Sequence, residues 1–196
     1  MDRFEYVMVL VSIIVGLSIA HVLFGVGRLI DRWAGGPKLQ WGWAHAFWLA
    51  YVFMWTVQFW WWEYRFSELN PTWTLGLYLF LVTYAILLFL LTVILVPHSW
   101  DGVDNLDTFF LQRRSWFYWT LAVGTCADVI DGLLKGGSSY VLDSLGASVW
   151  TLWLITAAAC IVGLRSRNIR HHIVVAMAVF FTQMIQAFLD LPTLGF

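Results

Sequence analysis

Six long apolar stretches divide the chain, and they constrain its fold more than any other feature of the sequence. Most are roughly 18 residues or longer, the length that a helix needs to cross the hydrocarbon core of a bilayer. With 61% hydrophobic and only 12% charged residues, the chain has too few polar groups for a water-facing surface. We therefore predict an all-α bundle of six transmembrane helices that forms one membrane domain over residues 1–196, with spans at about 6–29, 43–64, 72–96, 115–134, 144–164 and 171–191.

The basic residues predict the orientation of this bundle, because Lys and Arg are enriched in cytoplasmic loops. Three of the eleven, Arg3, Arg65 and Lys135, lie at the N-terminus or beside the second and fourth loops. The other eight lie at the first, third and fifth loops: Arg28, Arg32, Lys38, Arg113, Arg114, Arg165, Arg167 and Arg170. This alternation predicts both termini on the non-cytoplasmic side. Most of the acidic residues fall on that outer side, where they would concentrate cations.

Two carboxylates in the fourth stretch are the best indication of function. Asp128 and Asp131 are three residues apart, so they share one face of a helix. A charge at the centre of a membrane helix costs on the order of 2.5–3.5 kcal/mol on insertion scales. Such residues usually face a protein interior, a watery cavity or a cation. The pair therefore predicts an ion-binding or proton-binding site in the outer half of the bundle.

Other polar residues in the outer half are candidates for the same site. Gln183 and Gln186 repeat the three-residue spacing in the sixth stretch, with Asp190 one turn further out, and Glu63 ends the second stretch. If the second, fourth and sixth helices face each other, these carboxylate and amide oxygens converge on a hard cation or a proton.

An alternative explanation needs no site. If the fourth helix begins further in than its apolar residues suggest, Asp128 and Asp131 lie at the level of the lipid headgroups. They would then pair with Lys135 or Arg65.

His21 is the histidine placed deepest in a predicted span. A buried histidine binds haem iron, relays protons or forms a structural hydrogen bond. A bis-histidine haem would require His45 at matching depth, and the sequence places His45 about one turn shallower. We therefore expect no cofactor, and we keep haem binding and an inner proton relay as alternatives to a structural hydrogen bond.

Ser12, Gly16 and Ala20 form a stripe of small residues along one face of the first stretch. Small residues let two membrane helices approach closely. The stripe predicts a helix contact, either within the bundle or with another subunit.

Sequence motifs of common enzymes are missing from the chain. It contains no G-x-S-x-G, H-E-x-x-H, C-x-x-C or phosphate-loop pattern. It also lacks a basic, aromatic surface of the kind that binds nucleic acid. We therefore predict a protein that is not an enzyme, has an undetermined metal preference, and has membrane lipids and other membrane subunits or copies of itself as partners.

The N-terminal residues carry a resemblance. Phe4-Glu5-Tyr6, then Gly16-Leu17-Ser18-Ile19-Ala20-His21 and Arg28-Leu29-Ile30, resemble the N-terminus of uncharacterised multi-pass membrane proteins of bacteria. The resemblance implies a location in the bacterial inner membrane and brings no activity with it.

Three functions remain open from the sequence. The leading one is binding or conduction of a small cation or proton through the outer-half carboxylates. The second is a non-catalytic accessory or scaffold subunit of a larger membrane complex. The third is a membrane protein that binds haem or a pigment.

Overall fold

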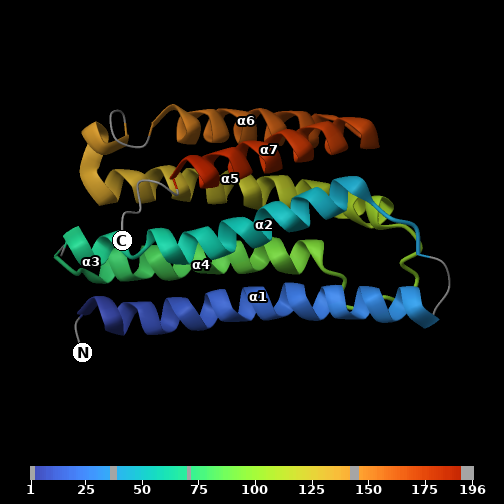
Figure 1. Ribbon diagram of the computed structural model, residues 1–196, viewed down its shortest axis with the longest axis horizontal. Helices are drawn as coiled ribbons and strands as arrows, with labels where there is room; N and C mark the ends of the chain where they lie inside the picture. Colours follow the sequence, from blue (N-terminus) through green and yellow to red (C-terminus); the bar gives the residue numbers. More distant parts are fainter. Residues whose placement is uncertain (1–2, 36–38, 70–71, 142–145, 191–196) are drawn as a thin grey trace.

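The described part of the chain is all-α, as predicted. The computed structural model describes residues 3–35, 39–69, 72–141 and 146–190 (Figure 1). Within these ranges six long helices overlap the six apolar stretches, and a five-residue helix, α3, follows α2. The helices are α1 (Arg3–Gly35), α2 (Trp43–Trp62), α3 (Arg65–Leu69), α4 (Leu75–Leu95), α5 (Leu106–Ser139), α6 (Gly146–Arg165) and α7 (Ile169–Asp190).

Four of these helices, α1, α4, α5 and α7, are long and apolar enough to cross a membrane. The helix α2 has 20 residues but is not among these four. It contains six tryptophans, a histidine and a glutamine, and these residues lower its mean hydropathy. The helix α5 begins about two turns before the apolar stretch predicted at 115–134, with Asn105 as its N-cap. The Asn105 side chain accepts a hydrogen bond from the Thr108 amide at 2.9 Å, as a helix N-terminus requires.

The long helices run alongside one another in an elongated bundle (Figure 1). The helix α1 packs against α4 and α2, α5 packs against α4 and α6, and α7 packs against α6 and α2. The start of α1 and the end of α7 lie toward the same end of the bundle. We call this the α3 end, because α3 also lies there.

Aromatic side chains fill the centre of the bundle. Trp48 is fully buried, and its ring centroid lies 4.9 Å from that of Phe117 and 5.6 Å from that of Tyr118. Large apolar side chains also cover the outside, where Phe24 is 72% and Trp116 is 74% exposed. An apolar surface of this extent would promote aggregation in water but suits contact with lipid tails.

At the end of the bundle opposite α3, the residues that precede α2 are hydrogen-bonded to the residues that precede α5. Gln40 and Asn105 form an isolated parallel bridge, and the Gln40 amide donates to the Asp104 carbonyl at 2.8 Å. Asp107 Oδ1 accepts from the His45 amide at 3.2 Å, so a carboxylate lies at the positive N-terminus of α2. These contacts set where α2 and α5 begin relative to each other.

Gly163 allows α6 to lie close to α5. A β-carbon at this position would overlap the ring of Tyr118, which is fully buried.

We expect Gly163→Leu to destabilise the protein by about 1–3 kcal/mol, the usual cost of overpacking. Thermal unfolding in detergent would measure this loss. Gly27→Leu is the control, because Gly27 also lies in a helix but has open space at its β-carbon; equal stability of the two variants would contradict the packing.

Candidate functional site

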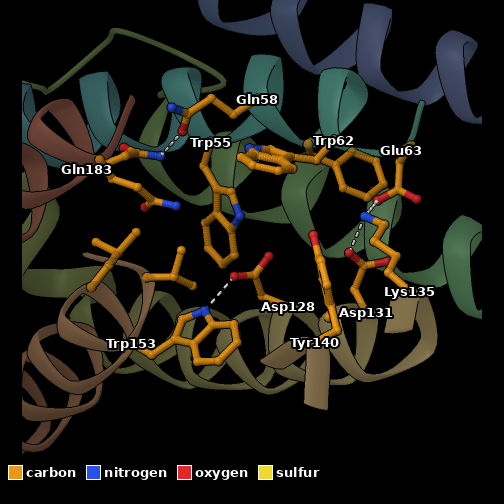
Figure 2. A pocket seen from close by; sticks show the side chains of 15 residues that line it. Trp55, Gln58, Trp62, Glu63, Asp128, Asp131, Lys135, Tyr140, Trp153 and Gln183 are labelled. Atoms are coloured by element: carbon orange, nitrogen blue, oxygen red, sulfur yellow. Dashed lines mark hydrogen bonds and ion pairs between the residues drawn. The ribbon is translucent and has the colours of Figure 1, made fainter. Parts of the chain in front are cut away.

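A pocket near the α3 end of the bundle brings most of the predicted ion-site residues together. It has a volume of about 70 Å³ and is lined by residues of α2, α5, α6 and α7 and of the segments that flank them (Figure 2). The predicted residues among them are Glu63, Asp128, Asp131, Gln183 and Gln186. Asp190 is the last residue of α7, and its side chain lies outside the described residues.

A buried ion cluster forms one side of the pocket. Lys135 Nζ donates to Glu63 Oε1 at 3.0 Å and also to Asp131 Oδ2. The side chains of Lys135, Glu63 and Asp131 are only 3%, 1% and 9% exposed. Lys135 Nζ also lies 5.2 Å from the centre of the Phe66 ring, which places the ammonium over an aromatic face. The cluster joins α5 to the C-terminal end of α2.

The cluster contains more acceptors than its lysine satisfies. Glu63 Oε2 and Asp131 Oδ1 are buried and have no hydrogen-bond partner in the described part of the chain. Three carboxylates and one ammonium line the pocket. If all four are ionised, two negative charges are left without a counter-charge among the lining residues, which is costly in a low-dielectric surrounding.

Asp128 lies apart from this cluster and has different partners (Figure 2). Its Oδ1 accepts from the Tyr84 hydroxyl at 2.5 Å, and its Oδ2 accepts from Trp153 Nε1 at 2.6 Å. Hydrogen bonds to an ionised acceptor are short and strong. Because Tyr84 belongs to α4 and Trp153 to α6, Asp128 ties the two neighbours of α5 to it.

Amide side chains form the third group in the pocket. The amide nitrogen of Gln183 lies 2.8 Å from Oε1 of Gln58, which links α7 to α2. Gln183 is buried, and Gln186 lies one turn further along α7 at the pocket wall. The predicted convergence of the second, fourth and sixth long helices is therefore observed here.

Glycines at the end of α5 shape the pocket wall beyond Lys135. Gly137 has φ 71° and ψ −167°, a region of backbone conformation that essentially only glycine adopts. The kink brings the Tyr140 ring back against Gly136, where a β-carbon would overlap it. The guanidinium carbon of Arg65 lies over the same ring, 4.6 Å from its centre, so Tyr140 is held at the edge of the pocket.

The two alternatives from the sequence differ in the membrane depth of Asp128 and Asp131, and both stay predictions. Asp131 pairs with Lys135, as the headgroup-level alternative proposed. Both residues are buried among helices, however, as the site hypothesis required. Asp128, by contrast, pairs with a tyrosine and a tryptophan and with neither predicted cation.

The remaining predicted residues lie elsewhere. His21 lines a second cavity, together with His98, between α1 and the segment after α4. His45 is buried, and its Nε2 lies 2.7 Å from the Leu95 carbonyl oxygen. In the small-residue stripe, Ser12 Oγ accepts from Trp60 Nε1 at 3.0 Å, whereas Gly16 is exposed and has nothing within 4 Å of its β-carbon position.

Several residues in or behind the pocket were not among the predicted site residues. Tyr84, which bonds Asp128 but does not line the pocket, gave no signal, because a tyrosine in an apolar helix is unremarkable. Trp55 and Trp153 fall at mid-depth in their spans, which is unusual for tryptophans that belong to an interfacial belt. Both line the pocket. Their mid-depth placement indicated either a cavity lining or ordinary packing against helices or lipid, and the sequence favoured packing.

No group of three or more His, Cys, Asp or Glu side chains is arranged to hold a metal ion in the described part of the chain. Comparisons of the chain with known protein families, with curated proteins and with solved structures gave no match.

We expect Lys135→Met to destabilise the protein by about 3–5 kcal/mol, because it leaves two buried carboxylates without their ammonium. Adding Glu63→Gln and Asp131→Asn removes those charges and should restore much of the loss. Equilibrium unfolding in detergent would measure both variants. If Lys135→Met were as stable as the original protein, the ion cluster would not contribute to folding.

Proposed function

We propose that this protein is a six-span protein of the bacterial inner membrane, with both termini outside the cytoplasm, that binds or conducts a proton or small cation through the pocket at the α3 end. The observation that carries the proposal is the pair of buried, unpartnered carboxylate oxygens, Glu63 Oε2 and Asp131 Oδ1, beside a single lysine. The orientation rests on the distribution of basic residues.

The charge balance of the pocket supports a cationic occupant. Glu63, Asp128 and Asp131 outnumber Lys135, and uncompensated charge among membrane helices is expensive. A proton or cation that enters the pocket reduces this cost. Binding is therefore coupled to the stability of the contact between α2 and α5.

A proton suits the pocket better than a metal ion. Calcium takes six to eight oxygen ligands and magnesium requires near-octahedral geometry, and the described residues include no group of three or more His, Cys, Asp or Glu side chains that could hold a metal ion. A proton needs only one carboxylate oxygen. The volume of about 70 Å³ has room for a few water molecules, which would carry protons between Asp131, Asp128 and the amides.

Proton flux into proteoliposomes with a pH-sensitive dye inside tests this function. We expect flux above that of empty vesicles, and we expect Asp131→Asn with Glu63→Gln to reduce it at least about tenfold, because the unpartnered carboxylate oxygens are then gone. Glu68→Gln is the matched control, since Glu68 lies on α3 but is exposed and outside the pocket. Equal flux in the two variants, or none in any protein, would contradict conduction through this pocket.

An accessory subunit of a membrane complex is the second candidate. The observation that favours it is Gly16, which lies in the small-residue stripe but is exposed and open at its β-carbon position. Within this chain the stripe bonds α2 at Ser12, and α1 also comes close to the C-cap of α4 at Gly25, whose β-carbon would meet Val96. A subunit role is distinguished by absence of flux from the purified chain together with a fixed partner retained in mild detergent.

A further inference from the structure

A second cavity lies away from the ion cluster, toward the other end of the bundle. It has a volume of about 380 Å³ and lies between α1 and the segment that follows α4. Its polar side chains are His21, Arg28 and His98, and apolar residues such as Phe24 and Pro97 complete the wall. No carboxylate is among the described residues that line it, so the cavity is basic where the first pocket is acidic.

Arg28 has hydrogen-bond capacity left over. Its Nη1 donates to the His98 carbonyl at 3.3 Å, which places the guanidinium at the edge of the cavity. A guanidinium has five N–H donors, so most of them remain for another acceptor. Asp31 lies one turn further along α1, but the described residues include no ion pair between it and Arg28. Arg28 is exposed and forms no ion pair with a described carboxylate, so its guanidinium is accessible to an anion.

His21 provides a second, independent indication of a ligand. Its Nε2 is buried and has no hydrogen-bond partner in the described part of the protein. A buried polar atom without a partner costs free energy. The ring is held edge-on to Phe89 of α4, with centroids 6.1 Å apart. His21 lines the cavity, but this nitrogen has almost no accessible surface, so a ligand oxygen reaches it when the ring turns toward the cavity.

The donors define the chemistry of the ligand. Guanidinium and imidazole groups on one cavity wall, with no acid beside them, suit an anion that presents several oxygens in a compact group. We propose that this cavity binds the phosphate of a phosphate ester, with Arg28 and His21 as its donors. The headgroup of a phospholipid and a soluble phosphate share this chemistry.

The surroundings favour a phospholipid as the source of the phosphate. Phe24 lines the cavity and is 72% exposed, so an apolar surface adjoins the basic one. Trp33, Trp41 and Trp43 form a chain of ring contacts at this end of the bundle, as tryptophans do at a membrane interface. Basic pockets between helices at the cytoplasmic interface bind anionic headgroups. This inference does not rest on the proposed proton site.

Native mass spectrometry of the full chain in detergent tests the proposal, with phosphatidylglycerol as the lipid probe and diacylglycerol as the lipid without phosphate. Titration calorimetry with inorganic phosphate tests the soluble source. We expect Arg28→Gln and His21→Phe each to weaken phosphatidylglycerol binding about tenfold, because each removes a donor to a charged acceptor. Arg113→Gln is the control, since Arg113 lies over the Phe109 ring, 4.1 Å from its centre, and outside the cavity.

Size-exclusion chromatography checks that each variant is folded. Because the Arg28 and His21 substitutions lie on different turns of α1, the test still stands if one of the two variants fails to fold. Binding of inorganic phosphate alone, with the same dependence on Arg28 and His21, would support the phosphate site with a soluble ligand. Equal binding by the two variants and the Arg113→Gln control, or diacylglycerol bound as tightly as phosphatidylglycerol, would overturn the proposal.

Discussion

The buried ion cluster of Lys135, Glu63 and Asp131 is the interaction on which the rest of the structure depends. Its three side chains are almost fully excluded from solvent, so the ammonium can be held there only if both carboxylates approach it. That requirement fixes the C-terminal end of α2 against α5. Asp128, one turn earlier, then connects α5 to α4 and α6 through Tyr84 and Trp153. The helix α5 thus contacts α2 and α6, which line the pocket, and α4 behind it.

The same cluster links packing to the proposed function. The lysine satisfies one oxygen of each carboxylate and leaves the other oxygen of each without a partner. A fully neutralised cluster would serve only to hold helices together, whereas this one keeps capacity for a further positive charge. The basic cavity at His21 and Arg28 has the opposite character. The two cavities give the bundle chemically distinct ends, in agreement with the asymmetric distribution of charged residues along the chain.

The sequence predicted the helices well and the site in part, for physical reasons. Span length and hydropathy define helices such as α1 and α4 locally, and the spacing of Asp128 and Asp131 places both on one helix face. Which faces meet depends on the rotation of each helix about its axis, and the chain does not encode that in any local pattern. The contact of Lys135 with Glu63, 72 positions away, and the Tyr84 hydroxyl on Asp128 were therefore beyond sequence reasoning.

Infrared difference spectroscopy of the purified protein, between mildly acidic and mildly alkaline pH, tests most directly whether the cluster holds an exchangeable proton. A protonated carboxyl group in a membrane protein gives a C=O band that shifts in D₂O. We expect such a band to appear and disappear with pH in the original protein and in Glu68→Gln, and to be lost in Asp131→Asn with Glu63→Gln. An unchanged band in that double variant, or no pH-dependent carboxyl band at all, would contradict proton binding by the cluster.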